Sequence, residues 1–399
     1  MTMGAIAEPL AYPTRRDEAW RYAPHRTLEA LTFGTPTTPP RDAGDPGEQL
    51  PGLDGPRIVV VNGIVDAGRS QLTEVPGLQL STLAESIEQA SAVTDAHLAV
   101  DEPADAFVAL NLEYAVDGAV IEVAAGTVLD DPIHVVDIAI PDSPGVASCT
   151  GVVIHLGAGS SATVIETRAG DGAMLGGSNI RTTVTLDPGA TLEHIVLQDV
   201  PAQQVHLSRV DVRQATDSTY RGRSFNIGAA YGRVTCHVAL EGAGAVADLS
   251  GLFHGIGDQT LDQQITVVHA VADCTSRQAF RGLLDDASTG VFNGGIDVRP
   301  GADGTDASQS NDNLLLSNRA EVNTQPRLEI LADDVTCTHG ATIGQIDDTA
   351  LYYLRTRGIG ADDARRILVH GFSDQVVDDI EIEQVRAWIT ERLGHASDA

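Results

Sequence analysis

The sequence contains no lysine, so its 25 basic residues are all arginines, and they are outnumbered by 56 acidic residues. The formal net charge at pH 7 is −31. Such a charge repels phosphate backbones and anionic lipid surfaces. We therefore expect neither a nucleic-acid partner nor a membrane partner. The lysine-free, acidic composition is consistent with codon bias and equally with a salt-adapted proteome.

Long apolar runs are also missing. No run reaches the roughly 18 residues that a membrane-spanning helix needs. The opening stretch MTMGAIAEPLAYPTRRDEAW lacks the charged start and apolar core of a secretory signal. These two absences predict a cytoplasmic protein.

Cysteine is scarce and dispersed. The four cysteines are Cys149, Cys236, Cys274 and Cys337, and no two of them form a CxxC pair. This spacing argues against a self-contained zinc site and against a disulfide framework. In a reducing cytosol, we expect most of them to be small buried hydrophobic residues.

Motifs of self-sufficient enzymes are missing as well. No glycine-rich turn ends in the Lys-Ser/Thr of a phosphate-binding loop, and there is no GxSxG elbow. The acidic pairs Asp285–Asp286 and Asp333–Asp334 are typical of solvated turns. We expect a chain that binds no ATP itself and is not an enzyme.

Residues 105–340 contain few aromatic residues and many short β-rich runs that are separated by small turns. Gly126, Gly159 and Gly189 each precede an alternating strand, and they recur at a spacing of about 30 residues, which is typical of stacked repeats. One coil cannot bury its own apolar face, so successive coils must stack. The pattern favours a mainly β fold with a right-handed parallel β-helix (solenoid) core. Short, evenly spaced strands also permit a β-sandwich.

The regions that flank residues 105–340 have a different sequence pattern. Residues 1–104 read as an α/β region with a Pro/Gly-rich loop, a strand over 56–65 and a helix over 80–90, for which Ser81 is a plausible N-cap. Residues 341–399 read as a helical domain. Its first helix is expected to end at Gly358, and a later one carries an apolar stripe, Ile382, Val385, Trp388 and Ile389.

Cys337 and His339 are the candidate metal-ligating residues. In an extended strand they face the same side, about 7 Å apart along the chain. A zinc or iron-sulfur site usually needs four donors, so two more must come from elsewhere. The competing interpretation is a buried thiol and a hydrogen-bonded histidine in the last coil. Cys236 and His237 are adjacent, hence on opposite faces, and are expected to be structural.

Two stretches resemble one known family. Residues 310–359, SNDNLLLSNRAEVNTQPRLEILADDVTCTHGATIGQIDDTALYYLRTRGI, resemble the signature region of the SufB/SufD family of iron-sulfur cluster assembly proteins. The early RRDEAWRYAP resembles the N-terminal element of that family. Within the family, CTHGATIGQ followed by LYYLRTRG looks like the D subunit.

The resemblance implies a function as a non-catalytic scaffold subunit. It implies pairing with SufB through the β-helix, and binding of the SufC ATPase by the helices of residues 341–399. It also implies that Cys337 and His339 hold a nascent iron-sulfur cluster transiently at the interface with SufB, with His339 the better supported. A reduced flavin in the complex is a further expectation, and an isolated chain could pair with itself as a homodimer.

Two other classes of function stay open at this point. A β-solenoid can also be a carbohydrate-binding or polysaccharide-processing protein, although secretion would then be expected. A free-standing metalloenzyme would need two further ligands near Cys337, and the spacing of the sequence suggests none.

Overall fold

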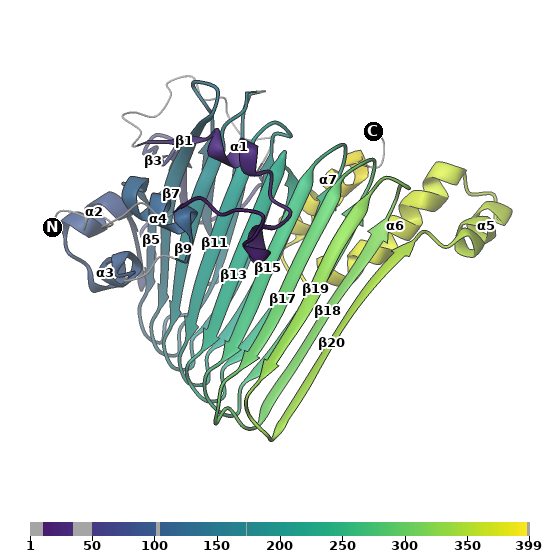
Figure 1. The fold of residues 1–399 in the computed structure, drawn as a ribbon. Helices are drawn as coiled ribbons and strands as arrows, with labels where there is room; N and C mark the ends of the chain where they lie inside the picture. Colours follow the sequence, from purple (N-terminus) through teal and green to yellow (C-terminus); the bar gives the residue numbers. More distant parts are fainter. Residues whose placement is uncertain (1–10, 35–49, 101–103, 173, 397–399) are drawn as a thin grey trace.

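The computed structural model describes residues 11–34, 50–100, 104–172 and 174–396. Within these residues, two ten-stranded sheets face each other (Figure 1). From β5 onward the chain alternates between the sheets, and every strand pair in this part is parallel. The prediction of a parallel β-solenoid is therefore confirmed, and the β-sandwich alternative, which needs antiparallel pairing, is wrong.

We call the two sheets the odd sheet and the even sheet after their strand numbers. The odd sheet contains β5 (Gly118–Val123), β7 (Val146–Leu156), β9 (Gly177–Leu186), β11 (Val205–Gln214), β13 (Tyr231–Leu240), β15 (Thr260–His269), β17 (Thr289–Val298) and β19 (Glu321–Ile330). At its N-terminal end, β4 (Leu78–Thr82) pairs antiparallel with β5, and β1 (Thr32–Phe33) pairs with β7.

The even sheet contains β6 (Ile133–Ala139), β8 (Ser161–Gly170), β10 (Thr191–Val200), β12 (Thr219–Gly228), β14 (Val246–Gly255), β16 (Thr275–Leu284), β18 (Thr305–Leu315) and β20 (Val335–Gln345). A hairpin of β2 (Arg57–Val61) and β3 (Ile64–Val65) extends this sheet at the N-terminal end.

Side chains of equivalent positions stack from one coil to the next. Leu192, Tyr220 and Ala247 are partners in register on three successive strands, and all three lie in the core between the sheets. Alternate residues point the other way: Phe225 and Leu252 pack on the outer face against the C-terminal helices. The period of two along each strand therefore separates an inward row from an outward row.

The turn glycines have the conformation that the repeat requires. Gly126, Gly159 and Gly189 have φ values of +71°, +66° and +71°, which side chains disfavour. The Gly126 N–H donates to the Ala158 carbonyl, and the Gly159 N–H donates to the Pro188 carbonyl, both at 2.9 Å. Each turn is thereby hydrogen-bonded to the turn of the next coil.

The N-terminal α/β region covers the first coils. It includes η1 (Glu18–Trp20), α1 (His25–Glu29), α2 (Leu83–Glu88), α3 (Ala92–Leu98) and α4 (Ala106–Tyr114). The N-cap of α2 is Thr82 rather than the expected Ser81, because the Thr82 hydroxyl accepts from the Glu85 N–H and the Glu85 carboxylate closes a capping box.

The C-terminal helices are α5 (Asp348–Thr356), α6 (Ala361–Val377) and α7 (Glu383–Ala396). Gly358, at φ +90°, follows α5 as predicted. Val385, Trp388 and Ile389 of the predicted stripe pack with α6 on the outer face of the even sheet. By contrast, α5 buries none of its residues and stands away from the sheets (Figure 1).

The two ends of the solenoid differ. The N-terminal end is covered by β2–β3, β4 and the helices α2 and α3. At the other end, β19 and β20 are the last strands of their sheets among the described residues. The expected domain boundary at residue 340 falls inside β20, and α4 occupies residues 106–114 at the start of the predicted solenoid.

Candidate functional site

Cys337 and His339 both lie on β20, and both belong to the inward row. Cys337 is in register with Ala307, and His339 is in register with Gln309, on the neighbouring strand β18. Ala307 and Gln309 are buried between the sheets. The structure therefore places the two candidate residues on one face, at the open end of the solenoid interior.

Cys337 is half-buried near the start of β20. It packs against a small apolar cluster that contains Val298, Ala302 and Ala307. Burial and the nearby negative charge of Asp306 raise the pKa of the Cys337 thiol, although a backbone hydrogen bond from Ala307 opposes them. The thiol is therefore protonated at neutral pH, and a metal ion must displace that proton to bind it.

His339 is exposed, unlike the residues that precede it in the same row. Within the described residues, its ring makes no hydrogen bond and no ion pair. Both ring nitrogens are thus available to an external group. This pattern contradicts the interpretation of His339 as a hydrogen-bonded core histidine, whereas Cys337 keeps a packing role.

The open end itself is polar in its backbone and apolar in several side chains. Because β19 and β20 each pair on one side only among the described residues, their outer edges present N–H and C=O groups that no strand in this part of the chain pairs. Ile330, Leu331 and Ile343 are 39%, 52% and 54% exposed there. Exposed apolar side chains next to an unpaired strand edge are typical of a surface that another chain covers.

The described part of the chain does not complete the site. Among the described residues, no group of three or more His, Cys, Asp or Glu side chains is arranged to hold a metal ion. Cys337 and His339 are donors that suit iron, but they supply two of the usual four.

The other cysteines are not poised for chemistry. Cys149 and Cys274 are buried, and burial raises the pKa of each thiol. Burial also raises the pKa of Cys236 to about 12. Cys236 packs against the main hydrophobic core, as expected of a structural residue.

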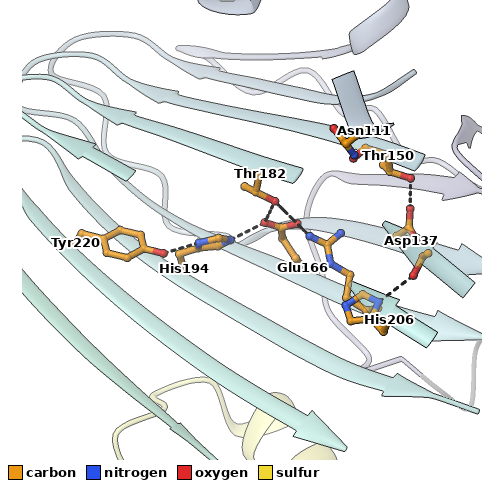
Figure 2. A network of polar contacts seen from close by, with 10 residues as sticks. Asn111, Asp137, Thr150, Glu166, Thr182, His194, His206 and Tyr220 are labelled. Atoms are coloured by element: carbon orange, nitrogen blue, oxygen red, sulfur yellow. Dashed lines mark hydrogen bonds and ion pairs between the residues drawn. The ribbon is translucent and has the colours of Figure 1, made fainter. Parts of the chain in front are cut away.

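A buried polar cluster between the sheets was missed from the sequence (Figure 2). Glu166 accepts hydrogen bonds from His194 Nε2 at 2.7 Å and from Thr182 Oγ1 at 2.9 Å, and it forms an ion pair with Arg168. Tyr220 contacts the other ring nitrogen of His194 at 2.9 Å. The signal was that Glu166 and Arg168 share one face of the strand ATVIETRAG with the apolar Ala162 and Val164, because side chains alternate with a period of two.

This cluster keeps its charges despite burial. Burial alone would raise the pKa of Glu166, but the Arg168 charge and the hydrogen bonds from His194 and Thr182 outweigh it and hold the pKa at about 2. Asp137, which accepts from Thr150 at 2.6 Å, has its pKa raised by burial.

No helix in the described part of the chain is long and apolar enough to cross a membrane.

The fold is a parallel β-solenoid. Its open end carries two residues of types that bind metal ions, which is an incomplete set of ligands. Two family models match the chain: the SufBD core domain of the SUF system for iron-sulfur cluster assembly matches residues 139–372, and the SufBD N-terminal region matches residues 8–135. The chain therefore belongs to the SufBD family of iron-sulfur cluster assembly proteins, as its signature region indicated.

Relatives of this chain include proteins named for iron-sulfur cluster assembly. The assembly protein SufD of Escherichia coli is 30% identical, over 96% of this chain and 88% of that protein. A SufBD family protein of Synechocystis is 26% identical over 94% of this chain and 86% of that protein. SufD of Bacillus subtilis is 33% identical over 37% of this chain and 34% of that protein.

Proposed function

We propose that this chain is a D-type scaffold subunit for iron-sulfur cluster assembly, which pairs with SufB through the open end of its solenoid and binds SufC through its C-terminal helices. In this proposal the chain works in the cytoplasm, binds no ATP itself and catalyses no reaction. The observation that carries the proposal is the placement of Cys337 and His339 on one inward row beside an unpaired strand edge.

SufB is the partner that the open end suits. A parallel solenoid of the same family presents a strand edge of the same spacing, so edge pairing would satisfy both sets of backbone groups. The exposed Ile330, Leu331 and Ile343 would be buried in the same step. The edge could also pair with a second copy of this chain when SufB is missing.

The nascent cluster is cargo at this interface. Cys337 would supply a thiolate and His339 an imidazole, while SufB would supply the remaining donors. An incomplete set of ligands suits a donor of clusters, because a complete four-ligand site would retain its cargo. Movement of the SufC pair on ATP binding could then open the interface and release the cluster.

The SufC dock is proposed at α5 and the adjoining part of α6. Tyr352 and Tyr353 on α5 are 69% and 56% exposed, and Ile367 on α6 is 48% exposed. Exposed tyrosines on a projecting helix are typical of interface hot spots.

The test is anaerobic reconstitution of the complex of this chain with SufB and SufC, followed by iron and sulfide analysis. We expect His339→Ala to assemble normally but to lower cluster yield by roughly tenfold or more, since loss of a ligand costs at least as much as loss of a residue that only orients a ligand. His155→Ala is the matched control, because His155 is a half-exposed surface histidine on β7 that pairs with Asp187.

Two results would contradict the proposal. A His339→Ala complex that loads iron and sulfide like the unaltered complex would leave no role for this residue in holding the cluster. A chain that stays monomeric by light scattering with SufB present, and that binds oligosaccharide instead, would favour the carbohydrate-binding alternative.

A further inference from the structure

Five amide side chains line the solenoid interior between the buried cluster and the open end. They are Gln198, Asn226, Gln263, Gln278 and Gln309, and each is at most 4% exposed. Gln198 is in register with Arg168 of the buried cluster, and Gln309 is in register with His339 of the last coil. We call this set the amide column. Its two ends therefore meet the two polar sites described above.

Glycines in the inward rows make room for these amides. A Cβ atom on Gly294 would lie 1.4 Å from Nε2 of Gln309, a separation that no real contact allows. A Cβ atom on Gly232 would lie 3.1 Å from Nε2 of Gln198. Because apolar side chains would otherwise fill these positions, the interior is shaped around the amides.

The amides satisfy each other only in part. Asn226 Nδ2 donates to Gln263 Oε1 at 3.2 Å, and Gln309 Nε2 donates to Gln278 Oε1 at 3.3 Å. Among the described residues, the buried atoms that keep no protein partner include Gln198 Oε1, Asn226 Oδ1, Gln263 Nε2 and Gln309 Oε1. At the inner end, Nε and Nη1 of Arg168 are likewise buried without a partner.

So many unpaired atoms are incompatible with a dry interior. One buried polar atom without a partner lowers the folding equilibrium constant roughly tenfold, so four of them would lower it roughly ten-thousand-fold, which is most of the stability of a typical domain. In native proteins, ordered water molecules supply the missing hydrogen bonds of such groups.

Ser224 shows that there is space for water beside the column. It points inward and accepts a hydrogen bond from Asn226 Nδ2 at 2.8 Å, yet it keeps accessible surface. Its outward neighbours on the strand, Arg223 and Phe225, are 5% and 0% exposed, since Arg223 pairs with Asp248 and the C-terminal helices pack on Phe225. The accessible surface of Ser224 therefore lies on the inner side of the sheet.

We infer that the amide column binds a file of ordered water molecules, which links the Glu166–His194 pair to the open end at His339. These waters accept from Arg168 and Gln263 and donate to the oxygens of Gln198, Asn226 and Gln309. The presence of this water is independent of the proposed function.

A crystal structure of the unaltered chain, at a resolution that shows ordered water, is the first test. Water within hydrogen-bond distance of Gln263 Nε2 and Gln309 Oε1 is expected. An interior that shows no water at any of the four unpaired amide atoms would overturn the inference, whatever the outcome of cluster reconstitution.

The second test measures how fast the His194 ring N–H exchanges with solvent, by NMR on a chain with ¹⁵N-labelled histidine. Gln309→Leu replaces the amide nearest the open end with an apolar side chain. This change should block the entry of water into the amide column and slow this exchange at least tenfold. His134 is the internal control, because it is buried and bonded to Thr167 Oγ1 but lies on an outward row. Equal exchange of His194 in both chains would show that water does not enter at His339.

Discussion

Arg233 joins the N-terminal segment to the odd sheet through three contacts. Its guanidinium lies 3.7 Å from the centre of the Trp20 ring, and Nη1 donates to Asp262 Oδ2 and to the Ala19 carbonyl, both at 2.6 Å. The side chains of Arg233 and Asp262 are 5% and 2% exposed. Removing the arginine would therefore leave a buried carboxylate with two neutral hydrogen-bond donors, Tyr231 at 2.8 Å and Gln264 Nε2 at 2.6 Å.

We predict that Arg233→Met lowers the free energy of unfolding by about 3–5 kcal/mol, because a buried charge loses its partner. The matched control is Arg213→Met on β11, whose ion pair with Glu241 is 68% and 43% exposed. That exposed pair should contribute less than about 1 kcal/mol. Urea denaturation followed by circular dichroism measures both free energies of unfolding. Equal losses in the two variants would show that the contacts of Arg233 stabilise the fold no more than an exposed ion pair does.

At the scale of elements, α6 and α7 differ from α5 in what they cover. Val369, Val376 and Trp388 pack on outward residues of the even sheet, so a truncation at residue 340 would remove the cover of Phe225 and Leu252 together with half of β20. If such a truncated chain failed to bind SufC, the result could not distinguish a lost docking surface from a lost fold. Substitutions on α5 can, because this helix buries none of its residues.

We predict that Tyr352→Ala lowers the affinity for SufC by roughly tenfold or more, as expected for a tyrosine hot spot. The melting temperature should stay unchanged, since the Tyr352 side chain is 69% exposed. Tyr22→Ala, at 41% exposure in the N-terminal region, is the control that should leave SufC binding intact. Isothermal titration calorimetry measures both affinities, and an unchanged affinity for Tyr352→Ala would move the dock away from α5.

At the scale of the whole molecule, buried histidines make stability depend on pH. Burial lowers the pKa values of His97, His134 and His206 to about 3, with a smaller contribution in each case from a nearby arginine. The unfolded chain takes up these protons below about pH 6.5, whereas the folded chain does not until about pH 3. Glu166 acts in the same direction below about pH 4.5, because its folded pKa is about 2.

We therefore predict that stability falls steeply as the pH decreases from 6.5 toward 4. At pH 5 each of the three histidines removes up to about 2 kcal/mol, and together up to about 6 kcal/mol. Urea midpoints measured across this range should show the loss, and His97→Gln should reduce its slope by about one proton. A midpoint that stays constant down to pH 5 would contradict the burial of these rings as neutral groups.

The sequence by itself determined the repeat, the helical ends and the candidate ligands. Gly126, Gly159 and Gly189 mark turns because few other residues adopt their backbone conformation. Gly358 ends α5 for the same reason. Cys337 and His339 share a face because side chains alternate along any strand. These are local properties of the backbone, and they need no knowledge of what packs beside it.

Only the tertiary structure decided which face is inside and which end is open. Glu166 and His194 are 28 positions apart and meet because β8 and β10 pair in one register. The N-cap at Thr82 instead of Ser81 depends on where β4 stops pairing with β5. The exposure of His339, against the burial of Gln309 one coil earlier, depends on the absence of a following strand within the described residues. Burial and charge pairing are properties of neighbours in space, so the sequence could name these residues but could not say what surrounds them.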